Sequence, residues 1–105
     1  MNLTRIEHLL KYLEEDPNDA FSLYALALEY KDDKPAEAER LFSQLLAAHP
    51  DYLPTYYQAA QLMETTGQVD KALKLYATGI DLAKQQNNQA TLRELKAAYD
   101  LLAEG

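Results

Sequence analysis

The sequence contains no cysteine and no tryptophan, and its 105 residues include only three glycines and four prolines. Without cysteine the chain can form neither a disulfide framework nor a thiolate metal site. Such a chain suits a reducing compartment, and we expect a cytoplasmic protein. The scarcity of glycine and proline, together with the lack of runs of β-branched residues, favours helix over sheet.

Basic charge and long apolar runs are also scarce. Ten Lys and Arg residues against 17 Asp and Glu residues give a formal net charge of −7. This balance argues against nucleic acid or an anionic membrane as a partner, since both attract basic surfaces. Residues 1–16 mix acidic with apolar side chains, so we expect neither a signal peptide nor a membrane span. Acidity of this size mainly aids solubility.

What the sequence does contain is an internal repeat. Residues 17–24 align with residues 50–57 at an offset of 50 − 17 = 33, which places Tyr24 on Tyr57. Farther along, Ala38 aligns with Ala72, and the offset becomes 72 − 38 = 34. The first copy therefore lacks one residue in its turn, where repeat arrays best tolerate a deletion.

Each arm of each copy carries apolar side chains at positions i, i+3, i+4 and i+7, which is the spacing of one helical face. The four sets are Leu23, Leu26, Ala27 and Tyr30; Ala38, Leu41, Phe42 and Leu45; Tyr56, Ala59, Ala60 and Met63; and Ala72, Leu75, Tyr76 and Gly79. Helices with such faces must pack on one another. A glycine within one set indicates a close approach of two helices, because glycine lowers helix propensity by about 1 kcal/mol against alanine.

The two ends of the chain show the same spacing, with Ile6, Leu9, Leu10 and Leu13 at the start and Leu95, Ala98, Tyr99 and Leu102 at the end. We therefore predict an all-α fold of about six helices in a single domain, residues 1–105. It comprises a flanking helix in 1–16, repeats in 17–49 and 50–84, and a capping helix in 88–104. Boundary signals agree, with N-caps at Asp19 and Asp33, prolines in first turns at Pro35 and Pro54, and turns at Gly67 and Asn87-Asn88.

These positions resemble the tetratricopeptide repeat, which alternates large, small and aromatic residues along two helices and places Gly at the turn between them. The second copy supplies Tyr56, Ala59, Ala60, Met63, Gly67, Ala72, Tyr76 and Gly79, and the first supplies Leu23, Leu26, Ala27, Tyr30, Ala38, Phe42 and Pro50. The departures are Met63 for an aromatic residue, Lys34 or Pro35 at the first turn, Leu45 for a small residue, and no proline after Asp81. The resemblance implies an α-solenoid of antiparallel helix hairpins.

The resemblance also implies a function, because proteins with such repeats are usually adaptors whose first helices line a concave groove for a peptide or helix. One subclass clamps a C-terminal carboxylate with Lys, Asn and Arg. The corresponding positions here hold Tyr24, Leu28, Tyr57 and Gln61, which predicts that this chain is not a carboxylate clamp. We expect an aromatic, weakly charged groove that binds a protein or peptide and is lined by Phe21, Tyr24, Leu28, Lys31, Pro54, Tyr57, Gln61 and Glu64.

Two alternatives remain open for this surface. In one, the tyrosines pack against flanking helices, including the last one. In the other, the short array self-associates into a homo-oligomer. An enzyme is the weakest hypothesis. His8 has no soft second ligand at helical spacing, His49 ends a helix where a partial positive charge is favourable, and the scattered glycines form no phosphate-binding loop. Runs of acids such as residues 14–16 are typical of solvated helix ends. We expect no cofactor and no bound metal.

Overall fold

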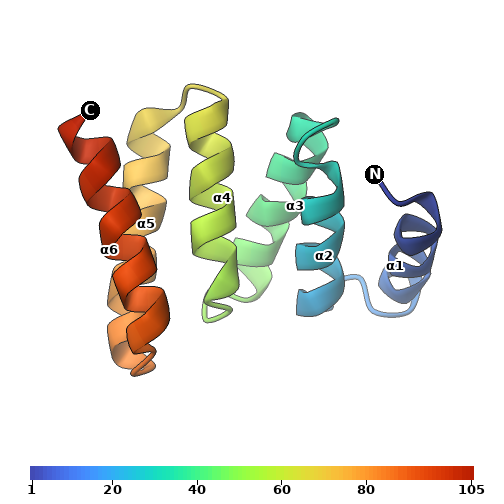
Figure 1. Ribbon diagram of the computed structural model, residues 1–105. Coiled ribbons are helices and arrows are strands. Elements are labelled where there is room, and N and C mark those ends of the chain that lie inside the picture. Colours follow the sequence, from blue (N-terminus) through green and yellow to red (C-terminus); the bar gives the residue numbers. More distant parts are fainter. The chain divides into compact units, whose positions relative to one another are not determined.

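A computed structural model describes all 105 residues and contains six α-helices and no strand (Figure 1). The helices are α1 (Leu3–Glu15), α2 (Ala20–Tyr30), α3 (Pro35–Ala48), α4 (Pro54–Thr65), α5 (Val69–Gln85) and α6 (Gln89–Glu104). The prediction of an all-α fold with six helices is confirmed. No helix combines the length and the apolar character that crossing a membrane requires.

The chain divides into two compact units, Met1–Thr55 and Tyr56–Gly105. The first unit contains α1, α2 and α3, and the second contains nearly all of α4 together with α5 and α6. The boundary lies just inside α4, near the predicted start of the second repeat. The assignment of residues 1–105 to one domain with the limits given above stays a prediction.

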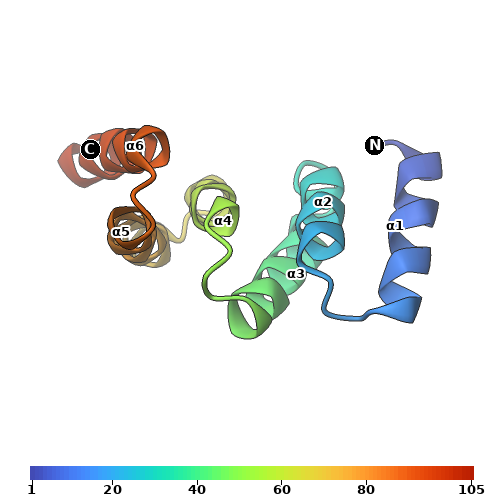
Figure 2. The same cartoon turned by 90° about the horizontal axis from the view of Figure 1, so that it is seen from below.

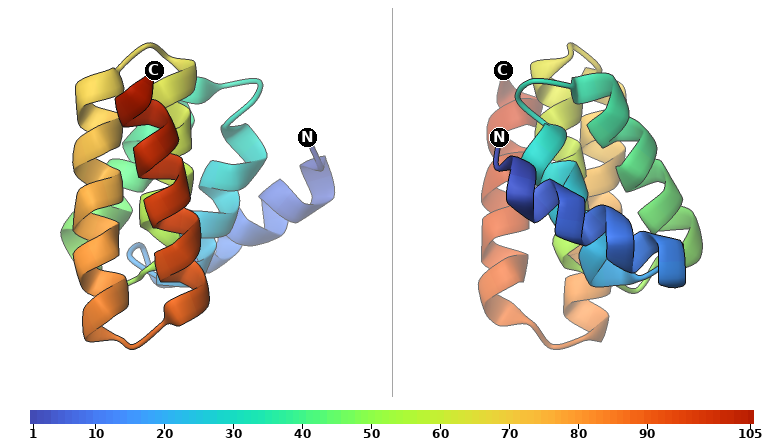
Figure 3. Two further views of the ribbon diagram at one scale, coloured as in Figure 1. Left: turned by 60° about the vertical axis from the view of Figure 1, so that its left-hand side comes forward. Right: turned by 90° about the vertical axis from the view of Figure 1, so that its right-hand side faces the viewer.

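In the first unit, α2 and α3 form a hairpin and lie side by side, and α1 packs on α2 (Figure 1, Figure 2). Figure 3 shows α1 crossing α2 obliquely. The predicted apolar faces of α2 and α3 are buried, apart from Tyr30, which is half-buried. The face of α1 is only partly covered, because Ile6 and Leu9 are buried whereas Leu10 is 45% exposed.

In the second unit, α5 and α6 run antiparallel beside each other (Figure 3). Contacts between α4 and α5 are close at Gly79, where an added Cβ atom would lie 2.8 Å from the Cβ of Tyr56 and 3.1 Å from Cδ1 of Leu95. The predicted packing role of Gly79 is therefore confirmed. The alanines at the matched small positions, Ala60 and Ala72, are fully buried.

The helix ends follow the boundary signals with one exception. Gly67 has φ +78°, the amide of Gln68 donates to the carbonyl of Met63, and α4 thus ends in a left-handed cap. Asn87 has φ 57° and ends α5 in the same way. The carboxylate of Asp19 accepts the amide of Ser22 at 2.9 Å and caps α2 as predicted.

The prediction that Asp33 caps α3 is wrong. The N-cap position is Lys34, and no side chain accepts a hydrogen bond from the first turn of α3. Pro35 follows directly as the first helical residue, where its missing N–H removes one donor that would otherwise need a partner. Here a residue with fixed φ begins the helix without a side-chain cap.

We expect Gly79→Ala to destabilise the chain. The new methyl group would meet a Cβ atom fixed to the backbone of α4, so the two helices would have to separate, at a cost of about 1–3 kcal/mol. The gain in helix propensity, about 1 kcal/mol, offsets only part of that cost. Urea unfolding measures the difference, with the exposed neighbour Thr78→Ala as a near-neutral control. Equal or greater stability of Gly79→Ala would contradict the close approach.

Asp19 and Asp33 form a matched pair for testing the caps. At neutral pH, Asp19→Ala should lower the free energy of unfolding by about 1 kcal/mol, whereas Asp33→Ala should have little effect. Hydrogen bonds from the Ser22 hydroxyl and amide lower the pKa of the Asp19 carboxyl. Its contribution is therefore full above the ordinary carboxyl pKa, near 4, and is lost as the pH falls through the folded value. Urea titrations at several acidic pH values should show the two variants converging.

Candidate functional site

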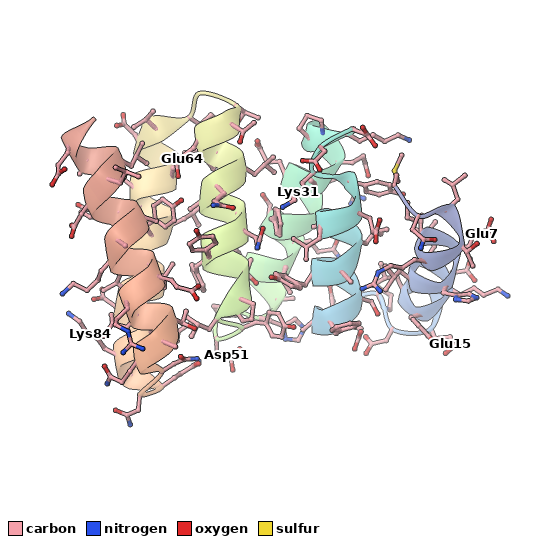
Figure 4. All side chains as sticks on the ribbon, in the orientation of Figure 1. Glu7, Glu15, Lys31, Asp51, Glu64 and Lys84 are labelled. Atoms are coloured by element: carbon pink, nitrogen blue, oxygen red, sulfur yellow. The ribbon has the colours of Figure 1, made fainter.

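Four of the predicted site residues form a strip along α2, which we call the α2 strip: Phe21, Tyr24, Leu28 and Lys31. Phe21 is 60% exposed, and the other three side chains are half-buried. The strip lies one position away from the buried face of α2. Figure 4 shows Lys31 near the C-terminal end of this helix, so the one charge of the strip lies at its end.

The ring of Tyr24 is held by a second aromatic ring. Its centroid lies 5.7 Å from that of Tyr52, with an angle of 64° between the ring planes, which is an edge-to-face arrangement. Tyr52 comes from the loop between α3 and α4 and is itself half-buried. Because Tyr52 lies outside any helix, the helical periodicity of the sequence carried no signal for it.

The other four predicted residues form the α4 strip: Pro54, Tyr57, Gln61 and Glu64. Tyr57 is half-buried and the other three are exposed. The Tyr57 ring packs edge-to-face on Tyr76 of α5, with centroids 6.1 Å apart and planes at 66°, and its hydroxyl accepts the amide of Gln61 at 3.1 Å. The two tyrosines that align in the sequence repeat are therefore each braced by another tyrosine, which comes from a loop for Tyr24 and from α5 for Tyr57.

Glu64 has a structural partner that sequence reasoning missed. The hydroxyl of the buried Tyr76 donates a hydrogen bond to the Glu64 carboxylate. Burial, followed by this hydrogen bond to a carboxylate, raises the pKa of the Tyr76 phenol well above its ordinary value. Glu64 is therefore hydrogen-bonded to the ring that braces Tyr57, and Figure 4 shows Glu64 near the C-terminal end of α4.

Each strip offers apolar contact area with a few polar tips. Neither strip combines a nucleophile with a base.

The structure contains no group of three or more His, Asp or Glu side chains that could hold a metal ion. His8 is exposed on α1, and a ring nitrogen of His49 lies 2.5 Å from the carbonyl oxygen of Asn18. The arrangement suits contact with another molecule. The single groove predicted to contain all eight residues stays a prediction.

Sequence reasoning also passed over Tyr12. This residue precedes the apolar position Leu13 on α1, and its side chain is 58% exposed beside a hollow that Phe21 also lines. Its position off the apolar stripe was the available signal. That signal is weak, because a single exposed tyrosine on a helix is common.

Two helix hairpins with small residues at matched contact positions define a helical-repeat protein. Comparison with known families makes this assignment specific, since the sequence model of the tetratricopeptide repeat matches residues 29–99. The chain belongs to the tetratricopeptide repeat family. The predicted family and its fold class, an all-α solenoid type, are therefore confirmed.

Solved structures agree with this assignment. The solution structure of a tetratricopeptide repeat domain protein from Salinibacter ruber is 40% identical, with a TM-score of 0.78, and the match covers 83% of this chain and 89% of that one. A crystal structure of a tetratricopeptide repeat domain protein from the same organism is 38% identical, with a TM-score of 0.77, covering 82% and 97%. MamA protein shares the fold at 22% identity and a TM-score of 0.70, covering 94% of this chain and 57% of MamA. No curated protein matches the sequence.

The Tyr76 hydroxyl predicts a pH dependence that can be measured. Since the folded pKa is raised, its contribution to stability is full below about pH 10, the ordinary phenol value, and is lost as the pH rises toward the folded value. Tyr76→Phe should cost about 1 kcal/mol at neutral pH and should lose less stability than the native chain between pH 8 and pH 11. Urea unfolding across this range measures both effects.

A matched control for that experiment is Tyr12→Phe, which removes the hydroxyl of an exposed ring. Its unfolding free energy should follow the native chain at every pH. If Tyr76→Phe also follows the native chain throughout, the hydrogen bond to Glu64 contributes nothing to the fold.

Proposed function

We propose that the chain is a non-catalytic interaction module, or scaffold, that binds a protein or peptide through the aromatic strips of α2 and α4. The family supports the general part of this proposal, because the tetratricopeptide repeat is generally a protein-interaction fold without catalysis. We further propose a cytoplasmic location, for which the absence of cysteine is the support.

The observation that carries the proposal is the bracing of Tyr24 and Tyr57. Each ring is partly exposed and is fixed edge-to-face by a second tyrosine. A ring that is already fixed loses little rotational freedom on binding, so more of its contact energy remains as affinity. Tyrosine also combines a large apolar area with one polar tip, which explains its enrichment at interfaces.

The chemistry of the strips favours an apolar or aromatic segment of a partner. Leu28 and the rings supply apolar area, while Lys31, Gln61 and Glu64 can fix its orientation through hydrogen bonds. We expect the segment to lie against either strip in an extended or helical conformation. The excess of acidic residues in the chain as a whole favours basic or neutral partners.

Self-association is a second candidate, favoured by leucines that are exposed in the terminal helices. Leu3 and Leu10 of α1 are 67% and 45% exposed, and Leu101 of α6 is 76% exposed. Such residues suit contact with a second copy of the chain. Sedimentation at several concentrations separates this candidate from peptide binding, because only self-association changes the mass with concentration.

The proposed function predicts that Tyr24→Ala combined with Tyr57→Ala abolishes partner capture from an extract of the native cells. Each truncation removes a braced ring, and loss of an aromatic contact of this type typically weakens binding by about 2 kcal/mol, or roughly 30-fold. Quantitative affinity capture measures the loss. Circular dichroism must show retained helicity, because collapse would assign both rings to the core.

Two controls make the capture experiment decisive. Ser43→Ala with Thr78→Ala changes exposed residues of α3 and α5 outside both strips and should leave capture unchanged. Gln61→Arg alters an exposed position of the α4 strip without touching the core and should reduce capture even if the double tyrosine variant unfolds. Full capture by a folded Tyr24→Ala and Tyr57→Ala variant and by a folded Gln61→Arg variant would rule out the strips as the binding surface.

A further inference from the structure

The surface between α1 and α2 contains two hollows that meet at a pair of aromatic side chains. One hollow has a volume of about 390 Å³ and extends toward Arg5 and His8 of α1, and the other, of about 330 Å³, extends toward the loop after α1. Tyr12 and Phe21 line both. All of these residues belong to the first unit, and neither Tyr24 nor Tyr57 lines either hollow.

The two shared aromatic side chains are unusually open. Tyr12 is 58% and Phe21 is 60% exposed, whereas the other aromatic residues of the chain are half-buried or buried. Exposed aromatic side chains that flank a hollow offer the apolar contact area and concave shape typical of interaction sites. A large apolar side chain of a partner would bury both rings.

The second hollow is acidic. It is lined by Glu15, Asp16 and Asp19, none of which forms an ion pair with a basic side chain of this chain. Asp19 is held in its ionised form by hydrogen bonds from the hydroxyl and amide of Ser22 at 2.6 and 2.9 Å. A cation placed here would meet Glu15 and Asp16, neither of which forms an ion pair within the chain.

The position of these acids opposes the stability of the helix itself. Glu15 is the last residue of α1 and Asp16 its C-cap, and the last turn of α1 contains no basic residue. Negative charge at a helix C-terminus is unfavourable, because the carbonyl ends of the peptide dipoles already point there. Figure 4 shows Glu15 at this end of α1. The dipole of α1 therefore gains nothing from these two charges, although the Asp16 carboxylate also accepts the amide of Asn18 at 3.4 Å, and their position favours a role in recognition.

We propose that the surface between α1 and α2 docks a peptide segment of a partner protein in which an aromatic or long aliphatic side chain is adjacent to lysine or arginine. The apolar side chain lies between Tyr12 and Phe21, and the cation lies against Glu15 and Asp16. Charge complementarity selects this occupant over an acidic one. Apart from the shared Phe21, the proposal is independent of the α2 and α4 strips.

The test uses the full chain labelled with ¹⁵N and an eight-residue peptide, capped at both ends, with a central Phe flanked by lysines and padded with Gly and Ser. Amide shifts should move in residues 4–22, and the affinity should fall with added salt. Two further peptides, one with Glu for Lys and one with Ala for Phe, should each bind at least tenfold more weakly. Equal binding of all three peptides would overturn the proposal.

A matched pair of variants separates local recognition from general acidity. Glu15→Gln with Asp16→Asn removes two charges from the hollow and should weaken binding at least fivefold without loss of stability, because both charges oppose the helix dipole. Glu7→Gln with Glu14→Gln removes two charges from the same helix outside the hollows and should leave binding nearly unchanged. An equal effect of the two pairs would overturn the proposal.

Substitution of Tyr12, one of the two aromatic residues that line both hollows, completes the test. Tyr12→Ser should weaken peptide binding at least tenfold, whereas Tyr24→Ala with Tyr57→Ala should retain it, so failure here and failure of the strips are distinguishable. Sedimentation of the native chain and of Tyr12→Ser identifies the other occupant. A native dimer that Tyr12→Ser dissociates would assign the surface to a second copy of the chain and overturn the peptide proposal.

Discussion

Close approach of paired helices at small side chains is the constraint on which both units depend. Ala27 and Ala38 in the first unit and Ala60 and Ala72 in the second are fully buried, and Gly79 leaves no room for a methyl group. When backbones lie this close, the large neighbouring side chains have one arrangement that fills the space. The positions of Tyr56 and Tyr76 follow from it, and with them the ring that braces Tyr57.

The sequence predicted the parts of the structure that repeat. Helical spacing, which recurs in each of the six helices, located all of them, and the small residues, which occur in both repeats, identified the family. Single local events were harder to predict. Asp33 precedes a helix that begins with Pro35 and needs no side-chain cap, and Leu10 shares the spacing of a core residue on a helix that is covered only in part. Periodicity describes one helix and contains no information on how far a neighbour covers it.

The candidate site shows the same division. The residues of the α2 and α4 strips could be chosen from the repeat, since they lie one position off the buried faces. The contacts that brace them could not, because Tyr52 comes from a loop and the Tyr76–Glu64 hydrogen bond joins two helices. Tyr76 was assigned to the core by its spacing, which is correct, yet its hydroxyl is also the donor that orients an exposed acid.

The turn between α5 and α6 has a mechanical consequence. The amide of Asn88 donates a hydrogen bond to the carbonyl of Ala83, and its side-chain oxygen accepts one from the amide of Thr91. A single residue therefore caps the C-terminus of α5 and the N-terminus of α6. Proteins open locally in cooperative units that often coincide with supersecondary motifs such as a helix hairpin. Here, loosening of one end releases the other, so hydrogen exchange should slow or quicken at both together, as a single opening event.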